Sequence, residues 1–112
     1  MENIIQSNEQ FEALKQNEVA FALYITEGTC NVGENLAPKL EKMFEENFPN
    51  IKMYFVYNNM NPEIAAQLGI FVVPAILIYF EGRLYIQKNR NISLYELEPE
   101  IDKLYKLVFD QE

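Results

Sequence analysis

One unbroken apolar run, Val19-Ala-Phe-Ala-Leu-Tyr-Ile25, constrains the fold of this 112-residue chain more than any other feature. A half-exposed strand alternates apolar and polar residues, whereas this run contains no polar position. Such a strand must be covered on both of its faces, as in the middle of a partly parallel sheet. The run therefore predicts a sheet with other elements packed on each side.

Capping signals locate the first and the last of four predicted helices. Ser7 with Gln10, and Ser93 with Glu96, have the spacing of a capping box, in which each side chain bonds the other residue's backbone N–H. The first helix is expected to end near residue 17. In the last helix, Pro99 is expected to delay or bend the first turns, because proline cannot donate a helical hydrogen bond.

The second and third helices are predicted from apolar spacing and from turn residues. The stretch 31–48 has apolar residues at helical intervals, and Pro38 within it should kink the helix. Asn61 as N-cap and Pro62 as the first helical residue begin a short helix, which Gly69 can end.

Three further strands are predicted at 51–57, 75–80 and 83–88, with a tight hairpin at Glu81-Gly82 and a short initial strand at 3–6. The resulting order is helix, strand, helix, strand, helix, strand, strand, helix. A parallel βαβ unit followed by an antiparallel hairpin and a closing helix describes an α/β fold. Specifically, it is a three-layer α/β/α sandwich with a mixed central β-sheet.

Length, charge and composition restrict the class of protein. A chain of 112 residues fits a single domain over 1–112. The net charge of −8 argues against nucleic acid and against an anionic membrane surface as partners, because both would repel the protein. The N-terminus lacks the pattern of a secretory signal, and no apolar run is long enough to span a membrane.

The counts of cysteine and histidine exclude several chemistries. The single cysteine cannot form an internal disulfide, so a reducing, cytoplasmic location is expected. The absence of histidine removes a Cys-His catalytic pair and a histidine metal site. We therefore expect no metal and no cofactor.

The lone cysteine, Cys30, lies where a predicted helix begins. With Thr29 as N-cap, its thiol would lie in the first helical turn, where the aligned N–H groups lower the pKa of a cysteine. The acidic neighbours Glu27 and Glu34 oppose this effect, so we expect moderate activation. The alternative is that Cys30 is an inert, small apolar residue.

Three local features, in order, resemble the thioredoxin superfamily over nearly the whole chain. The apolar strand leads into Cys30 at a helix start, and Pro38 follows where thioredoxins carry a helix-kinking proline. The stretch "NNMNPEIAAQLGIFVVPAILIYFEGR" resembles the family's Asn-Pro-capped helix, Gly-Ile turn, apolar-Pro pair and hairpin. Pro74 matches the family's cis-proline, and a last helix from Ser93 completes the pattern.

The active-site motif departs from that of the family. Where a typical thioredoxin has Trp-Cys-Gly-Pro-Cys, this chain has "TCNVG", with Thr29 in the Trp position and Gly33 in place of the resolving cysteine. The acidic residue that relatives bury beneath the site falls at Tyr24. The resemblance thus implies a monothiol Cys-X-X-Gly (CxxG) site, with Cys30 as the attacking thiol.

The resemblance also implies which residues meet a substrate. Cys30 would be the nucleophile, and a bend at Pro74 would expose backbone that pairs with an extended substrate segment. Phe71 and Val72 would rim the same groove or lie in the core. The implied substrate-binding residues are Thr29, Asn31, Val32, Gly33, Val73 and Pro74.

Two functions remain open at this stage. The first is monothiol thiol–disulfide exchange that contributes to cell redox homeostasis, with cysteine-containing proteins or a low-molecular-weight thiol as partners. The second is a catalytically inactive thioredoxin-fold module that binds a protein, favoured by the joint loss of the resolving cysteine, the Trp and the buried acid. Whether Cys30 turns over, and the oligomeric state, stay open.

Overall fold

The computed structural model of the protein describes residues 3–27 and 36–109. Within them, helices and strands follow one another in the predicted order. The elements are α1 (Asn8–Asn17), β1 (Ala20–Thr26), α2 (Leu36–Asn47), β2 (Lys52–Tyr57), α3 (Pro62–Leu68), β3 (Ala75–Phe80), β4 (Arg83–Asn89) and α4 (Leu94–Phe109).

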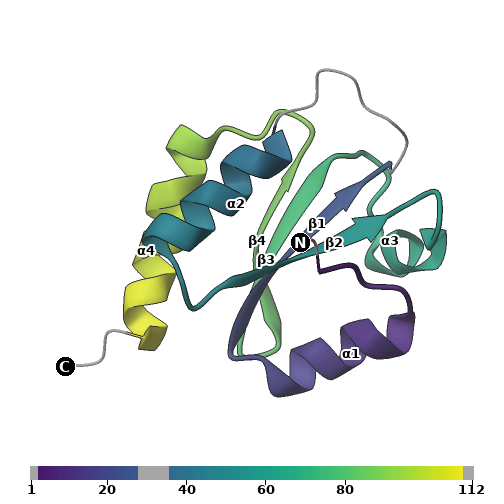
Figure 1. The fold of residues 1–112 in the computed structure, drawn as a ribbon, viewed down its shortest axis with the longest axis horizontal. Coiled ribbons are helices and arrows are strands. Elements are labelled where there is room, and N and C mark those ends of the chain that lie inside the picture. Colours follow the sequence, from purple (N-terminus) through teal and green to yellow (C-terminus); the bar gives the residue numbers. More distant parts are fainter. Residues whose placement is uncertain (1–2, 28–35, 110–112) are drawn as a thin grey trace.

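The strands form one mixed sheet in the order β2-β1-β3-β4 (Figure 1). β1 runs parallel to β2, so α2 is the crossover of a βαβ unit. β3 is antiparallel to β1 and to β4. The predicted βαβ unit and hairpin are therefore confirmed.

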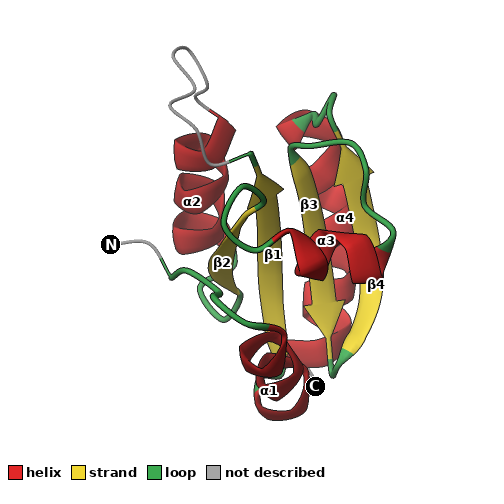
Figure 2. Ribbon diagram, turned by 90° about the vertical axis from the view of Figure 1, so that its right-hand side faces the viewer, coloured by secondary structure: helices red, strands yellow, loops and turns green. Residues whose placement is uncertain are grey.

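Helices cover both faces of the sheet, with α2 and α4 on one side and α1 and α3 on the other (Figures 1 and 2). Successive side chains of β1 point to the two faces of the sheet in turn, and all seven residues are buried. Ala22 and Tyr24 pack with α2 and α4, whereas Phe21, Leu23 and Ile25 pack with α1 and α3. The three-layer sandwich expected from the sequence is confirmed.

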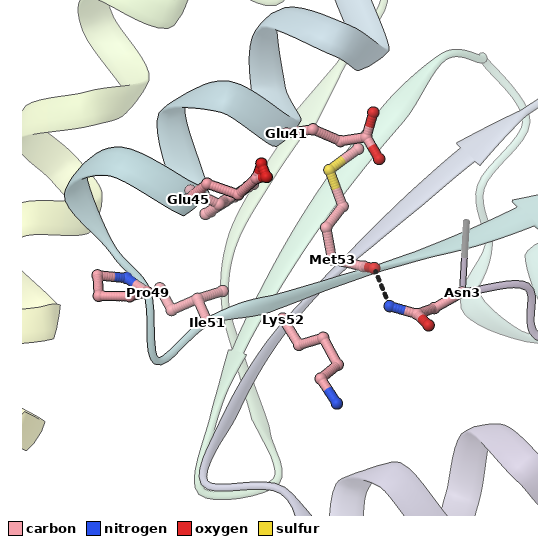
Figure 3. Close-up of a pocket in the computed structure, with 8 residues that line it drawn as sticks. Asn3, Glu41, Glu45, Pro49, Ile51, Lys52 and Met53 are labelled. Carbon is pink, nitrogen blue, oxygen red and sulfur yellow. Dashed lines mark hydrogen bonds between the residues drawn. The ribbon is translucent and has the colours of Figure 1, made fainter. Parts of the chain in front are cut away.

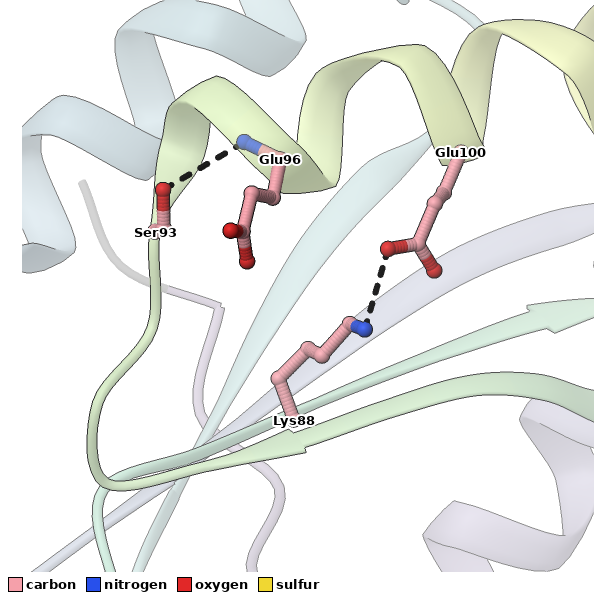
Figure 4. A network of polar contacts seen from close by, with 4 residues as sticks. All are labelled: Lys88, Ser93, Glu96 and Glu100. Atoms are coloured by element: carbon pink, nitrogen blue, oxygen red, sulfur yellow. Dashed lines mark hydrogen bonds and ion pairs between the residues drawn. The ribbon is translucent and has the colours of Figure 1, made fainter.

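Both predicted serine caps are formed. The Ser7 hydroxyl accepts the Gln10 N–H at 3.1 Å, and the Ser93 hydroxyl accepts the Glu96 N–H at 3.3 Å (Figure 4). In a capping box the Gln10 side chain would accept the N–H of Ser7. Here it accepts the N–H of Gln6 instead, at 2.9 Å. The hydroxyls nevertheless fix where α1 and α4 begin.

Pro99 does not delay α4. The helix begins at Leu94, and Pro99 lies inside it. Proline leaves one carbonyl of the preceding turn without its helical donor, here that of Tyr95. The Tyr95 side chain is 91% exposed, so this side of the helix faces water, which can bond the carbonyl.

Three other expectations need revision or stay open. Asn61 precedes α3, and Pro62 is its first residue as expected, but the Asn61 side chain makes no capping hydrogen bond. The initial strand is reduced to one bridge between Ile4 and Phe55. The described part of α2 begins at Leu36, so the kink expected at Pro38 stays a prediction.

An ion pair connects the edge strand β4 to α4. Lys88 Nζ lies 2.9 Å from Glu100 Oε2, and both side chains are partly exposed (Figure 4). Exposed pairs of this kind stabilise a fold by at most about 1 kcal/mol. The pair thus orients α4 on the sheet but is a minor part of its packing, which depends on buried Leu97 and Ile101.

The tip of the β3–β4 hairpin fits closely against the end of α1. Glu81 and Gly82 have φ values of 53° and 80°, as a two-residue hairpin turn requires. A Cβ on Gly82 would lie 2.9 Å from the Lys15 carbonyl oxygen. Gly69, which ends α3, also has positive φ at 72°, but a Cβ there would meet nothing within 4 Å.

We therefore expect Gly82→Ala to lower the free energy of unfolding more than Gly69→Ala. Both variants strain a left-handed residue by about 1–2 kcal/mol, and only Gly82→Ala adds a contact with backbone, for about 1 kcal/mol more. Urea unfolding monitored by circular dichroism measures the difference. Equal losses in the two variants would contradict the close packing of hairpin and helix.

Tyr79 belongs to an aromatic cluster beneath α1. Its ring stacks on Phe21 with centroids 4.8 Å apart and meets the edge of Phe11 at 5.7 Å. Burial, with a smaller contribution from the nearby charge of Glu12, raises the pKa of Tyr79 to about 12. The folded state therefore favours the neutral phenol.

This shift makes stability depend on alkaline pH. The pKa of Tyr79 in the folded state exceeds the unfolded value of about 10. The stabilisation that neutral Tyr79 contributes is therefore complete below pH ~10 and is lost as the pH rises to ~12. We expect Tyr79→Phe to lose less stability than the wild type over that interval. The matched control, exposed Tyr95→Phe, should follow the wild type. Urea unfolding at stepped pH measures the free energy of unfolding as a function of pH. Identical slopes of this free energy against pH for Tyr79→Phe and wild type would refute the expectation.

Candidate functional site

The carboxyl ends of β1 and β2 and the start of β3 meet at one edge of the sheet. Thr26 pairs with Tyr57 in the parallel ladder, and Ile25 pairs with Ala75 in the antiparallel one. Backbone bonds continue beyond the strands, from the Asn58 N–H to the Thr26 carbonyl at 2.8 Å. Pro74, which directly precedes Ala75, therefore arrives beside the end of the strand that leads toward Cys30.

The segment before β3 is fixed by β4. The Val73–Pro74 peptide bond is cis. The Arg90 N–H donates to the Pro74 carbonyl at 2.7 Å, and the Asn89 side-chain amide donates to the Val72 carbonyl at 3.0 Å. The last residue of β4 and the residue after it thus set the path of the segment.

Apolar side chains project from this segment into solvent. Phe71 is 85% exposed and Val72 40%, and Met60, in the loop before α3, is 62% exposed. The alternative that Phe71 and Val72 are core residues is therefore wrong. Large exposed apolar side chains next to a conformationally fixed segment are typical of binding surfaces.

A hollow of about 280 Å³ lies between this segment and α3. Ala65 and Ile70 supply buried apolar wall, while Phe71 and Val73 come from the segment itself. The Glu27 side chain also lines it. The hollow can accept an apolar side chain, with a carboxylate at its border.

Of the residues predicted for the site, the structure describes two. Val73 and Pro74 lie together at the sheet edge, with Val73 packed against the cluster under α1 and α3. The others fall outside the described residues: Thr29, Cys30, Asn31, Val32 and Gly33.

Tyr24, which stands where relatives bury an acid, has no exposed surface. Its ring meets Phe55 edge to face at 5.7 Å. An aromatic side chain in this position cannot act as a carboxylate that accepts or donates protons beneath the site.

Sequence reasoning missed the contribution of Asn89. Asparagine near a strand end is common, and nothing in the linear sequence pairs it with Val72, 17 positions away. Only the register of the hairpin, in which Asn89 lies opposite Ala75, reveals the contact.

The described residues include no group of three or more His, Cys, Asp or Glu side chains placed to hold a metal ion. Among the helices of residues 3–27 and 36–109, none has the length and apolar character needed to cross a membrane.

Comparison with known proteins finds thioredoxins and thioredoxin-like proteins, by sequence and by structure. No family model matches the chain. The thioredoxin-like protein YdfQ of Bacillus subtilis (strain 168) is 28% identical over 94 residues, which cover 84% of this chain and 82% of that protein.

Solved structures share the fold at lower identity. Thioredoxin from Trypanosoma brucei brucei superposes with a TM-score of 0.79 at 20% identity, over 95% of this chain and 92% of that one. A chain from a structure on the thiol resolving mechanism in yeast mitochondrial 1-Cys peroxiredoxin via glutathione/thioredoxin systems has a TM-score of 0.79 at 16% identity. The superposed residues cover 91% of this chain and 94% of that one.

The contact between Asn89 and Val72 leads to a test. Asn89→Ala removes the only side-chain bond described for the Val72 carbonyl, at a cost of about 1 kcal/mol. Amide hydrogen exchange at Val72 and Val73 should become several-fold faster. In the matched control, Gln87→Ala, the Gln87–Asn89 bond of 3.2 Å is lost but the Val72 bond is kept. Exchange that is equally fast in both variants would contradict this role of Asn89.

Proposed function

Since the chain belongs to the thioredoxin superfamily, we propose that it acts in thiol–disulfide exchange through Cys30 and so contributes to cell redox homeostasis. The site would be the monothiol sequence Cys-Asn-Val-Gly, residues 30–33. Its partners would be cysteine-containing proteins or a low-molecular-weight thiol. A reducing cytoplasm suits a protein that acts through one unpaired cysteine.

The observation that carries this proposal is the meeting of strand ends. β1 ends at Thr26, four residues before Cys30, and Pro74 precedes the residue that pairs with Ile25. We infer that Cys30, four residues beyond this strand end in the sequence, reaches the edge of the sheet where the backbone of Val73 lies. This arrangement supports a substrate segment that lies along Val73 while its sulfur reaches Cys30.

The chemistry of a single thiol proceeds in two exchanges. The Cys30 thiolate attacks one sulfur of a substrate disulfide, so a new S–S bond forms to Cys30 and the other substrate sulfur leaves as a thiolate, which takes up a proton. Because Gly33 cannot attack the mixed disulfide, a second thiolate from a small thiol or another protein must do so. That step regenerates the Cys30 thiolate and leaves the substrate linked to the second thiol.

Neighbouring residues would assist in different ways. Thr29 would cap the helix, and Asn31, Val32 and Gly33 would shape its first turn, where backbone N–H groups stabilise a thiolate. Val73 and Pro74 would hold the substrate backbone. Exposed Phe71 would cover the apolar side chains that flank the substrate's sulfur.

A second candidate function is a protein-binding module without turnover. Buried Tyr24 favours it, because the acid that assists exchange in relatives is replaced by an aromatic ring. Exposed Met60, Phe71 and Val72 would then hold a partner without a covalent step.

The reactivity of Cys30 separates the two functions. We expect the rate of alkylation by iodoacetamide to reach its plateau well below pH 8 in the folded protein. The same chain in urea is the matched control, with a thiol pKa near the ordinary value of about 8.5. Mass spectrometry of quenched samples gives both rates. A slow reaction with the unperturbed pH profile would contradict a working thiol.

Transfer from a mixed disulfide provides the second measurement. A peptide–glutathione mixed disulfide should leave glutathione on Cys30, whereas Cys30→Ser should show no adduct. Gly33→Cys supplies a resolving thiol and should convert that adduct into an internal disulfide. Absence of transfer from glutathione and from other small thiols would leave only the binding module.

A further inference from the structure

Arg90, the residue that follows β4, has a backbone conformation that is uncommon for a long side chain. Its φ is 60°, in the left-handed region that glycine enters freely and that asparagine enters more readily than most other residues. Asparagine stands on both sides of it, as Asn89 and Asn91, yet the left-handed residue is the arginine. The conformation of the turn therefore does not explain the arginine.

Backbone hydrogen bonds hold Arg90 in this conformation. The Arg90 N–H donates to the Pro74 carbonyl at 2.7 Å, and the Arg90 carbonyl accepts the Ile92 N–H at 3.0 Å. A strained conformation persists only where the surrounding structure enforces it. Arg90 is exposed, so burial of its side chain in the core does not offset the strain. The fold thus holds a cation at this position although the conformation lowers its stability.

The register of the sheet brings Arg90 to the edge where the candidate site lies. Ala75 lies opposite Ile25 of β1 and opposite Asn89 of β4. One residue closer to the edge, Pro74 therefore lies between the end of β1 and Arg90. Neighbouring strands are about 4.8 Å apart, so the Arg90 backbone lies roughly 10 Å from the end of β1. A small molecule and an arginine side chain are together long enough to span this distance.

The guanidinium group of Arg90 favours one class of ligand. Its planar set of N–H donors matches both oxygens of a carboxylate and binds them through two parallel hydrogen bonds. The net charge of −8 repels a strongly acidic protein surface, whereas a small molecule with one carboxylate interacts mainly with the charge closest to it. A guanidinium at this edge therefore favours a small anionic ligand.

We propose that Arg90 determines the specificity of the site by binding the carboxylate of a low-molecular-weight thiol. This inference rests on the proposed exchange function, in which an outside thiol must complete the reaction because Gly33 cannot. In the mixed disulfide, the sulfur of the small thiol is bonded to Cys30, and its carboxylate pairs with the Arg90 guanidinium. The ion pair stabilises this adduct, so small thiols that carry a carboxylate compete best for Cys30.

Competition between two small thiols of similar size tests the proposal. The protein is equilibrated at neutral pH with equal concentrations of 3-mercaptopropionate and 2-mercaptoethanol and of their disulfides. The Cys30 thiolate attacks one sulfur of a small disulfide, a new S–S bond to Cys30 forms, and the other half leaves as a thiolate. Mass spectrometry of acid-quenched samples gives the ratio of the two adducts. The same chain in urea supplies the reference ratio, because unfolding separates Arg90 from Cys30.

We expect the ratio of the mercaptopropionate adduct to the mercaptoethanol adduct to be about threefold higher in the folded wild type than in urea, and to fall as salt screens the ion pair. Arg90→Gly should lose this preference while resisting urea at least as well as the wild type, because glycine adopts positive φ without strain. Arg90→Lys should keep part of the preference, since an ammonium binds a carboxylate without the paired geometry. The control Arg83→Ala removes the same charge from the other end of β4 and should keep the wild-type ratio.

A folded ratio equal to the ratio in urea, or an undiminished preference in Arg90→Gly, would overturn the proposal. An equal loss in Arg83→Ala would do the same, because the effect would then come from net charge alone. A stronger preference for acetyl-Asp-Cys-amide over acetyl-Asn-Cys-amide would assign the guanidinium to acidic protein segments instead. Slow adduct formation with an intact preference would contradict the exchange function alone, and absence of both adducts would contradict both proposals.

Discussion

The burial of β1 on both faces is the constraint on which the rest of the structure depends. All seven of its residues are buried, and removing a side chain of this strand would leave a gap in the layer against which it packs. Phe21, Leu23 and Ile25 require α1 and α3, while Ala22 and Tyr24 require α2 and α4. Because β2 and β3 flank it, β1 also fixes which strand ends come together. Layering and the location of the candidate site thus follow from one apolar strand.

The same strand separates two surfaces of different chemistry. At its carboxyl end, exposed Phe71 and Met60 offer apolar contact next to Pro74. Near the start of the neighbouring strand, Glu41 and Glu45 of α2 line a hollow together with Phe44, Ile51 and Met53 (Figure 3). The first surface is thus mainly apolar, whereas acidic side chains border the second.

Periodicity and caps predicted the order of the elements, the βαβ unit, the hairpin and the ends of α1, because short-range sequence patterns mark these features. The same patterns did not predict that the initial strand is a single bridge at Ile4 or that α4 continues through Pro99. Each of these features depends on which backbone groups face water in the folded chain. For the site, the sequence named Val73 and Pro74 but not Asn89, whose bond to Val72 needs the hairpin register.

The short segment Asn3–Ile5 has a consequence for the behaviour of the protein at high concentration. At the other edge of the sheet, β4 carries an irregularity opposite Ile78 and Tyr79 and charged residues such as Arg83 and Lys88, which discourage pairing with another sheet. The edge of β2 has no comparable distortion in its ladder with β1. Its protection is the backbone of three residues that occupy both hydrogen-bonding groups of Phe55. We expect a chain that begins after Ile5 to expose both backbone hydrogen-bonding groups of Phe55 and therefore to pair with other chains more readily, so this short segment bears on self-association as well as on folding.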